Sequence, residues 1–540
     1  MFEVETAERG SATYAGKSLA ERLAGRFYTP SNLADDLALQ MLKPLETWSS
    51  KKITAVDPFC GDGRLIAALL KAAATNSHLK CLKWIIELRD REKGALEEAA
   101  ANVGATASAL SINAEVRTSL GDSFKSQCIP HYDLVISNPP WELLKPDRRE
   151  TAHLSSAEKI VYREKLREHS KRLDAAFPDA KAEKAWAGWG TNLARCGWDL
   201  CLRIARQGGV IGIILPSTIL GDQSSAPMRR KTFAENRVID MASYPPEARL
   251  FDRVDQPVVT LTVVKGAVPQ RTMAVRSFDS DQALESKNPI SIGAAAMEAR
   301  GWTIPLGPAA AIANMLDDLA TFPTLSALES EDKEGLWLGR ELDESQIATK
   351  LTNGAAFPFI KGRMVKRHKV VEAPVRSVRP ELCAHFHSIK LPRVVWRDVA
   401  RSSSERRMIG TIIPSGWVAG NSLHVGCFRD GNLTRTRALH ALLSSLVVEA
   451  QVRTRLTTGH MSLGIVRQAR IPKLNADNLR ILDAAAQASL SDLPESKFQS
   501  EIEVAKVYGI DRNGMSRLLG MFPKISDSEK DELLITKRWG

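Results

Sequence analysis

Short apolar runs alternate with longer amphipathic stretches between residue 53 and about residue 265. The runs are Ile53–Val56, Leu82–Ile86, Leu134–Ile136 and Val210–Leu215. Runs of this length, separated by helix-length segments, predict a parallel sheet whose crossovers are helices. Val238–Met241 and Val258–Val264 follow one another closely and predict a hairpin-like edge to the same sheet.

The pattern changes outside this region, and the changes divide the 540 residues into parts. Ser31 and Asn32 are capping residues for a helix that carries Leu33, Leu37 and Met41 on one face. A charged, helix-prone insertion interrupts the alternation of the main region. We expect a lead at 1–24, an α/β domain at 25–270 with the insertion at about 145–185, a linker at 271–300, a mixed α+β domain at 301–490 and a helical tail at 491–540.

A glycine-rich turn follows the first apolar run. Residues 57–64 read DPFCGDGR, in which Asp57, Phe59, Gly61 and Gly63 are candidate ligand contacts. Glycines between a strand and a helix let the backbone approach a ligand closely. The turn has neither the GxGxxG nor the GK[ST] pattern of phosphate-binding loops. The acid that opens it suits a cationic ligand, such as the amino or sulfonium end of S-adenosylmethionine.

Two further acids follow predicted strands. Glu87 comes directly after Leu82–Ile86, where a carboxylate can accept hydrogen bonds from both ribose hydroxyls. It can equally be an acid placed at a helix N-terminus by the helix dipole. Asp122 ends another predicted strand and is a candidate acceptor for an adenine amine. Taken alone, Asp122 is better explained as a turn residue.

The segment Asn138-Pro139-Pro140-Trp141 carries the strongest chemical signal, and it follows the run Leu134–Ile136. The two prolines remove backbone donors and stiffen the chain. The Asn138 side-chain oxygen and the Pro139 carbonyl can then face one cavity. Two acceptors aimed at an amine orient its hydrogens and leave its lone pair available for attack. Trp141 offers a flat surface on which a planar base can stack.

These four signals share one property, which is that each lies at the carboxyl end of a predicted strand. In an open α/β sheet those ends meet at one edge, where ligands bind. Asp57, Glu87, Asp122 and Asn138 are therefore expected to line a single site.

In this order the motifs resemble the gamma class of amino-methylating DNA methyltransferases, the adenine-N6 enzymes of restriction–modification systems. The resemblance covers roughly residues 22–266. The Gly loop departs from the usual DPACGSG at Phe59 and Asp62. The segments that carry the resemblance are Gly25–Pro30, Asp57–Gly63, Asn138–Trp141, Gly208–Ser217 and, more loosely, Leu250–Phe251.

The resemblance implies a Rossmann-like class I methyltransferase sheet with a C-terminal DNA-recognition domain, and it places the SAM-binding catalytic domain at 25–270. It implies S-adenosylmethionine as cofactor and the N6 amine of a flipped adenine in double-stranded DNA as target. Asn138, Pro139, Pro140 and Trp141 would be catalytic, and Trp141 and Phe251 would stack on the base. The cofactor-binding residues would be Tyr28, Thr29, Pro30, Asp57, Phe59, Gly61, Gly63, Glu87, Asp122 and Asn138.

Positive charge is concentrated in the C-terminal half. The whole chain carries a net charge of +11, and residues 360–410 contain 13 basic and 4 acidic residues. Such a region suits phosphate contacts and salt-sensitive DNA binding, although a solvated basic face is the alternative. The candidate DNA-binding residues are Lys361, Arg363, Lys366, Arg367, Lys369, Arg393, Arg397, Arg406 and Arg407.

Several alternatives remain beside this interpretation. Methylation of the N4 amine of cytosine uses the same acceptors, although that type more often carries SPP[YW]. A protein-glutamine methyltransferase would have no use for the large basic C-terminal half. A DNA-binding protein with an inactive methyltransferase fold is disfavoured by the intact motifs. No fused nuclease is expected, so a restriction endonuclease would be a separate partner.

Composition narrows the remaining possibilities. The seven scattered cysteines have no CxxC pair, and His385 and His387 lack further ligands at metal spacing. Neither a disulfide framework nor a metal site is therefore expected. The absence of a signal peptide and of a membrane-spanning stretch predicts a cytoplasmic protein.

Overall fold

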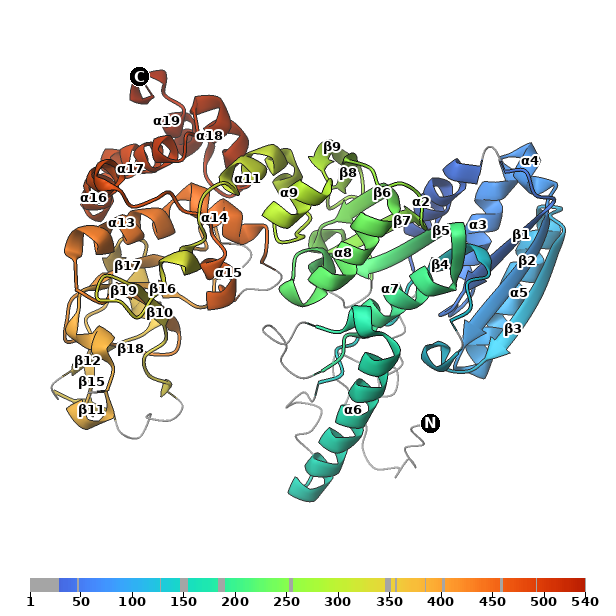
Figure 1. The fold of residues 1–540 in the computed structure, drawn as a ribbon, viewed down its shortest axis with the longest axis horizontal. Coiled ribbons are helices and arrows are strands. Elements are labelled where there is room, and N and C mark those ends of the chain that lie inside the picture. The colour runs from blue at the N-terminus through green and yellow to red at the C-terminus, as the bar shows by residue number, and fades with distance from the viewer. Residues whose placement is uncertain are drawn as a thin grey trace. The chain divides into compact units, whose positions relative to one another are not determined.

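The computed structural model describes residues 29–539, apart from 46–47, 127, 146–153, 183–189, 252–255, 345–350, 355–356, 384, 401–403, 457–459 and 492. The chain divides into two compact units, the first ending at Gly307 and the second beginning at Pro308 (Figure 1). Each unit has its own β-sheet structure and its own buried core. In the described residues, no helix is both long enough and apolar enough to cross a membrane.

A nine-stranded sheet organises the first unit, in the order β3-β2-β1-β4-β5-β7-β6-β8-β9. The strands are β1 (Lys52–Asp57), β2 (Lys83–Asp90), β3 (Ala114–Leu120), β4 (Tyr132–Ser137), β5 (Ala205–Pro216), β6 (Arg237–Tyr244), β7 (Val258–Val264), β8 (Thr272–Phe278) and β9 (Leu284–Ser291). Neighbours from β3 to β5 are parallel, whereas β7 runs antiparallel to both β5 and β6. The predicted parallel sheet is therefore confirmed. β6 and β7 form the predicted antiparallel pair, but β8 and β9 extend the sheet beyond them.

Helices cover both faces of this sheet. Helices α2 (Ser31–Leu42), α3 (Arg64–Ala74) and α5 (Lys93–Ala109) share one core with Leu134 and Ile136 of β4. Val135, which alternates with these two residues, is buried on the other face. Helix α7 (Leu193–Ile204) packs on β4 and β5, and its buried residues lie outside the first core. The sheet is thus the middle layer of three.

Residues 271–300 belong to this unit and do not form the expected linker. They contain β8, β9 and helix α9 (Ala294–Ala299). β8 pairs in parallel with β6 and antiparallel with β9. Met273, Val275 and Ile290 are buried. Most side chains of β9 are exposed or half-buried, and that polar composition is why an edge strand looked like a linker in the sequence.

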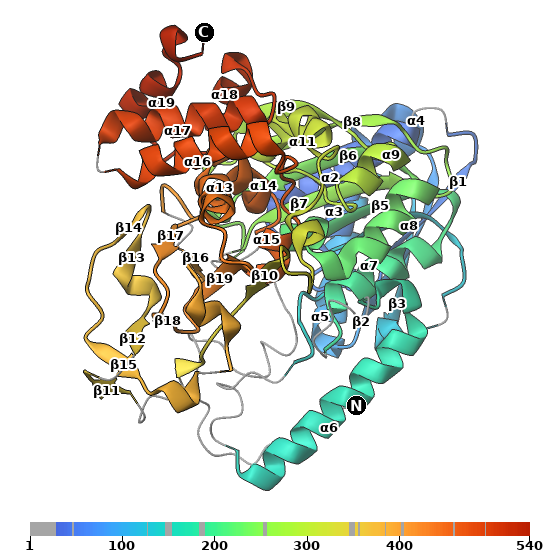
Figure 2. The same cartoon turned by 60° about the vertical axis from the view of Figure 1, so that its left-hand side comes forward.

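A long helix, α6 (Ser156–Ala176), occupies the predicted insertion at 145–185. The Ser155 hydroxyl accepts a hydrogen bond from Glu158 N at 3.3 Å, and Glu158 Oε2 accepts one from Ser155 N at 2.7 Å. This reciprocal pair is a capping box, which satisfies two backbone donors at the helix start. Only Leu166, Ser170 and Leu173 of the helix are buried. Figures 1 and 2 both show α6 extending away from the sheet of its own unit.

The second unit mixes small sheets with helices. Its strands are β10 (Leu336–Gly339), β11 (Thr352–Asn353), β12 (Phe357–Ile360), β13 (Val365–Lys366), β14 (Lys369–Val370), β15 (Arg376–Val378), β16 (Arg393–Arg397), β17 (Gly410–Ile413), β18 (Val418–Ala419) and β19 (Leu423–Phe428). They form sheets in the orders β10-β19-β16-β17, β11-β15-β12-β18 and β13-β14. The helices are α10 (Pro308–Ala311), α11 (Ala313–Leu319), α13 (Leu433–Ser444), α14 (Leu446–Arg453), α15 (Leu463–Arg467), α16 (Ala476–Leu490), α17 (Pro494–Val507), α18 (Arg512–Leu519) and α19 (Asp527–Leu533).

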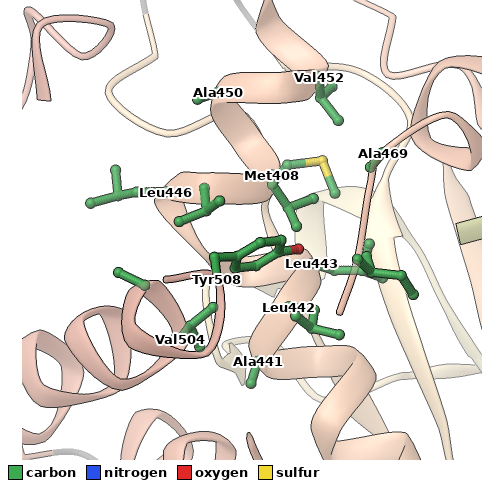
Figure 3. Close-up of a cluster of buried hydrophobic side chains, with 14 of the residues drawn as sticks. Met408, Ala441, Leu442, Leu443, Leu446, Ala450, Val452, Ala469, Val504 and Tyr508 are labelled. Carbon is green, nitrogen blue, oxygen red and sulfur yellow. The ribbon is translucent and has the colours of Figure 1, made fainter. Parts of the chain in front are cut away.

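The C-terminal helices share the core of this unit. Tyr508, which follows α17, is buried beside Leu442 and Leu446 (Figure 3). Its hydroxyl donates a hydrogen bond to Arg470 O at 2.9 Å. The same core includes Trp396 of β16. The residues predicted as a helical tail therefore pack as one body with the sheet that precedes them.

Candidate functional site

Asp57 begins the site at the end of β1, where it is fully buried. Its Oδ1 accepts hydrogen bonds from Phe59 N at 3.0 Å and from Ser137 Oγ at 2.8 Å. These bonds fix the start of the glycine-rich loop against the end of β4. Its Oδ2 is buried, and no described residue donates a hydrogen bond to it. The carboxylate therefore offers a free acceptor to a ligand.

The electrostatic environment of Asp57 is unusual for a carboxylate. Burial raises the pKa of Asp57 to about 7, and the neighbouring Asp90 and Asp62 carboxylates act in the same direction. The hydrogen bonds from Phe59 and Ser137 oppose this rise. A positive charge beside Oδ2 would favour the ionised form and lower the pKa again. The loop thus has the properties expected for a cationic ligand.

Gly63 cannot be replaced without moving the loop. It adopts a left-handed conformation with φ +77° and immediately precedes α3. A Cβ atom built here would lie 2.9 Å from Ala99 O and 3.0 Å from Val103 Cγ2, both on α5. Gly61 is also left-handed, with φ +52°, but no atom would crowd its Cβ. Backbone geometry requires both glycines, and packing requires Gly63 as well.

Glu87 does not lie at a strand end as predicted, because β2 continues to Asp90. Asp57 is paired in register with Leu88, so the alternation of side chains places Glu87 on the opposite face of the sheet. Its carboxylate accepts hydrogen bonds from Tyr132 Oη at 2.5 Å and from Arg89 Nε at 2.6 Å. Burial acts to raise the pKa of Glu87, but these two hydrogen bonds hold it below its ordinary value. The carboxylate is therefore already engaged by the protein.

Asp90 is the acid that ends β2, and it was not among the residues predicted from the sequence. It shares the sheet face of Leu88 and Asp57 by alternation. Its Oδ2 accepts a hydrogen bond from Gly61 N at 3.1 Å, so it lies directly beside the glycine loop. The signal that could have identified it is its place as the last residue of the strand that precedes α5.

Asp122 follows β3 and opens a short 3₁₀ turn, Ser123–Lys125. Its Oδ1 accepts a hydrogen bond from Phe124 N at 3.1 Å, as a turn residue does. The Ser123 hydroxyl donates to Pro58 O at 2.6 Å and ties this turn to the glycine loop. A cavity of about 230 Å³ opens here, lined by Arg89, Ser119, Leu120, Gly121, Asp122, Ser123, Lys125 and Ser126. The predicted hydrogen bond from an adenine amine to the Asp122 carboxylate stays a prediction.

Asn138 follows β4 at the same sheet edge. Its Nδ2 donates a hydrogen bond to Thr29 Oγ1 at 3.2 Å, while its Oδ1 is buried without a hydrogen-bond donor among the described residues. Arg64 Nη1 donates to Thr29 O at 2.7 Å, which links the N-terminal segment to the glycine loop. Pro30 then precedes α2. Tyr28, the remaining residue predicted in this segment, lies outside the described residues.

Helix α7 approaches Pro139 and Phe59 closely at Gly197. A Cβ atom at Gly197 would lie 2.3 Å from Pro139 Cβ and 3.5 Å from Phe59 Cε2. Pro139 is buried and Pro140 is half-buried. Gly197 therefore lets the glycine loop and the proline segment approach one helix closely. Gly197 could not be identified from the sequence, because a lone glycine within a helix carries no sign of its partner.

Trp141 and Phe251, the two residues predicted to stack on a base, lie in contact. Their ring centroids are 5.0 Å apart with an interplanar angle of 75°, an edge-to-face arrangement. Phe251 is buried and Trp141 is half-buried. The structure thus brings together two residues that are 110 positions apart in the sequence. Their role in stacking stays a prediction.

The predicted DNA-binding set in the second unit includes arginines that are structural. Arg393 is fully buried, and its Nε lies 2.7 Å from Glu341 Oε1. Arg406 is also buried, and it pairs with Glu449 at 2.8 Å and Glu501 at 2.7 Å. Arg367 pairs with Glu501 at 2.9 Å. Arg393 and Arg406 are therefore not surface contacts, because acids far away in the sequence neutralise them.

Three further members of the set are half-buried. Arg397 donates to Val365 O at 2.8 Å from its Nε, and Lys361 pairs with Glu344. Arg407 also belongs to this group. The remaining members, Arg363, Lys366 and Lys369, are exposed on and beside the β13–β14 hairpin. The surface available for a polyanion is thus narrower than the sequence suggested.

Several histidines of this unit lie close together: His368 Nδ1 is 3.2 Å from His440 Nε2, and His424 and His460 both approach Asp398. His424 Nε2 lies 2.9 Å from Asp398 Oδ1, and His368 is buried. His385 and His387 are exposed. Within the described ranges, no group of three or more histidine, cysteine, aspartate or glutamate residues could hold a metal ion.

Gly197→Ala should destabilise the first unit by about 1–3 kcal/mol, because the added methyl group overlaps Pro139. Gly104→Ala is the matched control, since nothing lies within 4 Å of a Cβ on that helical glycine. The control should be neutral or stabilising by up to about 1 kcal/mol. Chemical denaturation of both variants measures the difference, and equal stabilities would contradict the close packing of α7 on the proline segment.

Arg393→Ala should cost about 3–5 kcal/mol of stability, because it leaves the buried Glu341 carboxylate without its partner. Arg363→Ala removes an exposed cation that is 73% accessible, and its effect on stability should stay within about 0.5 kcal/mol. Thermal and chemical unfolding of the two variants would check this. If the Arg393 variant were as stable as the Arg363 variant, the buried ion pair of Arg393 with Glu341 would be contradicted.

Comparison with known proteins relates the chain to restriction–modification enzymes. No protein-family profile matches it. The Type II methyltransferase M.BanIII of Aneurinibacillus aneurinilyticus is 31% identical over 148 residues, which cover 24% of this chain and 24% of that protein. The chain therefore matches about a quarter of the length of this curated relative.

Two solved structures share the fold over most of the chain. The Type IIL restriction-modification enzyme MmeI, solved in complex with DNA, is 9% identical and superposes with a TM-score of 0.51 over 94% of this chain and 74% of its own. A nuclease-deletion mutant of the Type ISP enzyme LlaGI, solved with a DNA substrate mimic, is 11% identical with a TM-score of 0.51 over 86% and 47%. At these identities the likeness concerns the fold alone. The chain has a mixed α/β fold with a central, parallel-rich sheet, and in about a quarter of its sequence it is similar to a Type II methyltransferase.

Proposed function

We propose that this chain is a DNA methyltransferase that transfers a methyl group from S-adenosylmethionine to the N6 amine of adenine. The observation that carries the proposal is the buried Asn138 Oδ1, which no described residue satisfies and which follows β4 beside Trp141. An unsatisfied buried acceptor is costly unless a ligand supplies the donor. An exocyclic amine is such a donor.

The glycine loop fits the cofactor on grounds of charge and space. Asp57 Oδ2 is a buried acceptor without a donor among the described residues, and a cation placed beside it would stabilise the ionised carboxylate that burial disfavours. Gly61 leaves open space beside the loop, since nothing lies within 4 Å of a Cβ built there, while Gly63 lets the loop pack against α5. Asp90, fixed beside Gly61, is a second acceptor in reach of this loop. S-adenosylmethionine, when bound, supplies an electrophilic methyl group.

The proline segment would orient the nucleophile. Asn138 Oδ1 and the Pro139 carbonyl would each accept one amine hydrogen, which leaves the nitrogen lone pair directed at the methyl group. Thr29 holds the Asn138 amide by accepting a hydrogen bond from Nδ2, so the oxygen keeps its direction. Orientation of this kind is worth several kcal/mol in a displacement, and no covalent enzyme intermediate is needed.

The target base must leave the duplex to reach this segment. Unstacking costs a few kcal/mol. Stacking on Trp141 would offset about 1–3 kcal/mol of that cost. Phe251 contacts Trp141 edge-to-face and would hold the indole ring in place for the base. The same acceptors would serve the N4 amine of cytosine, and the asparagine in NPPW is what favours adenine.

The second unit would supply contacts to DNA. Arg363, Lys366 and Lys369 are exposed cations on and beside one small hairpin, where phosphate contacts are possible without breaking a buried ion pair. We infer that the enzyme modifies DNA as part of a restriction–modification system and acts beside a separate endonuclease.

Asn138→Ala should lower methyl transfer to DNA by at least about 100-fold, by analogy with loss of one directed hydrogen bond at a reacting centre. Binding of S-adenosylmethionine and of duplex DNA should change little. Transfer of a labelled methyl group gives the rate, and calorimetry and fluorescence anisotropy give the two affinities. Loss of DNA binding with an unchanged transfer rate would contradict the role of Asn138.

The affinity for S-adenosylmethionine should rise as the pH increases through about 7 and then level off. Asp57 must ionise to accept the cation, so binding below this pH releases a proton. Because its folded pKa lies above its unfolded value, the ligand-free protein should lose stability as the pH rises from about 4 to 7, where the folded state still holds the Asp57 proton that the unfolded chain has released. Calorimetry in buffers of different ionisation enthalpy would detect the proton. Asp57→Asn should weaken binding and remove the pH dependence, and a dependence that survives would implicate another group.

A further inference from the structure

Helix α6 is anchored beside the NPPW segment. Residues 142–144, which follow the NPPW segment, pair with residues 191–193 at the start of α7. Leu144 N donates to Thr191 O and Leu193 N donates to Glu142 O, both at 2.9 Å. The Thr191 hydroxyl donates to Asp174 Oδ1 at 2.8 Å, and Asp174 lies in the last turn of α6. The C-terminal end of α6 is thus tied to residues that immediately follow Trp141.

Four cations recur at every fourth position of α6, namely Lys159, Arg163, Arg167 and Lys171. Residues four apart lie on the same side of an α-helix, one turn above the other. The last three are exposed and Lys159 is half-exposed. We call this set the α6 basic stripe. It extends over about 18 Å, with about 6 Å between successive members.

The α6 basic stripe is distinct from the face that attaches the helix to the protein. The buried residues Leu166 and Ser170 each precede a member of the stripe by one position. Adjacent positions are about 100° apart around a helix, so the stripe lies beside the buried face and remains accessible. With only three buried residues in 21, most of the helix surface faces outward (Figure 2).

We propose that the α6 basic stripe contacts the backbone phosphates of DNA next to the flipped base. This inference rests on the proposed function. A DNA strand presents one phosphate about every 3.4 Å along the helix axis, so cations about 6 Å apart meet roughly every second phosphate. The hydrogen bonds at Glu142, Leu144 and Thr191 tie the C-terminal end of α6, where the stripe ends, to the segment that follows Trp141. Holding the strand beside the extruded nucleotide would keep the duplex in register while the base is out of the stack.

The experiment compares two double variants of the full-length protein that have the same change in charge. Arg163→Gln with Lys171→Gln removes two members of the stripe. Lys165→Gln with Arg172→Gln removes one lysine and one arginine from the opposite side of the same helix, where both side chains are exposed. Binding of a fluorescein-labelled DNA duplex is measured by anisotropy between about 50 and 200 mM salt, without cofactor. Circular dichroism verifies that both variants fold.

The stripe variant should bind more weakly and should reduce the slope of log affinity against log salt by about 2, since each lost phosphate contact removes about 0.9. The control variant should retain the slope of the unaltered protein. Equal slopes for the stripe variant and the unaltered protein would overturn the inference and leave α6 as a solvated arm or a surface for a protein partner. If the unaltered protein itself binds no DNA, both the proposed function and the inference about the stripe fail. The behaviour of the unaltered protein therefore distinguishes failure of the proposed function from failure of the stripe inference alone.

Discussion

The carboxyl ends of β1, β2 and β4 meet at one edge of the sheet, and the remaining features of the site depend on that constraint. Parallel pairing of β1 with both neighbours sets Asp57 beside the end of β4, where the Ser137 hydroxyl donates to its carboxylate. Asn138 follows at once. Two buried oxygens, Asp57 Oδ2 and Asn138 Oδ1, are left without donors among the described residues. The proposed reaction gives each of them a partner: a cation at the first and an amine at the second.

Close packing holds this edge in place. Gly63 lets the loop lie against α5, and Gly197 lets Pro139 and Phe59 lie against α7. Thr29 contacts both Arg64 and Asn138, so a segment before the first strand connects the two motifs. The two glycines and Thr29 thereby fix the position of the glycine loop relative to the proline segment, whose side chains the proposed chemistry uses. Such positions resist substitution for geometric reasons even though they would touch no substrate.

Much of the first unit could be predicted from the sequence because β1, β4, β5 and β7 are buried on both faces along most of their length and form apolar runs. The end of β2 could not, since Glu87 and Arg89 interrupt the apolar run while satisfying one another within the strand. β9 was missed for a related reason, as an edge strand needs few apolar residues. In the second unit, composition revealed the excess of arginine but not its partners. Glu341 is 52 residues from Arg393 and Glu501 is 95 residues from Arg406, so only the fold shows that these charges are neutralised.

The central claim is methylation of adenine in DNA, and direct detection of the product tests it. Unmethylated plasmid is incubated with the protein and S-adenosylmethionine and then read by single-molecule methylation-sensitive sequencing. The account predicts N6-modified adenine in one recurring sequence context, with no modification by Asn138→Ala. Modified cytosine would retain the fold and the site but overturn the base. A folded protein that binds both cofactor and DNA yet leaves every base unmodified would contradict the account.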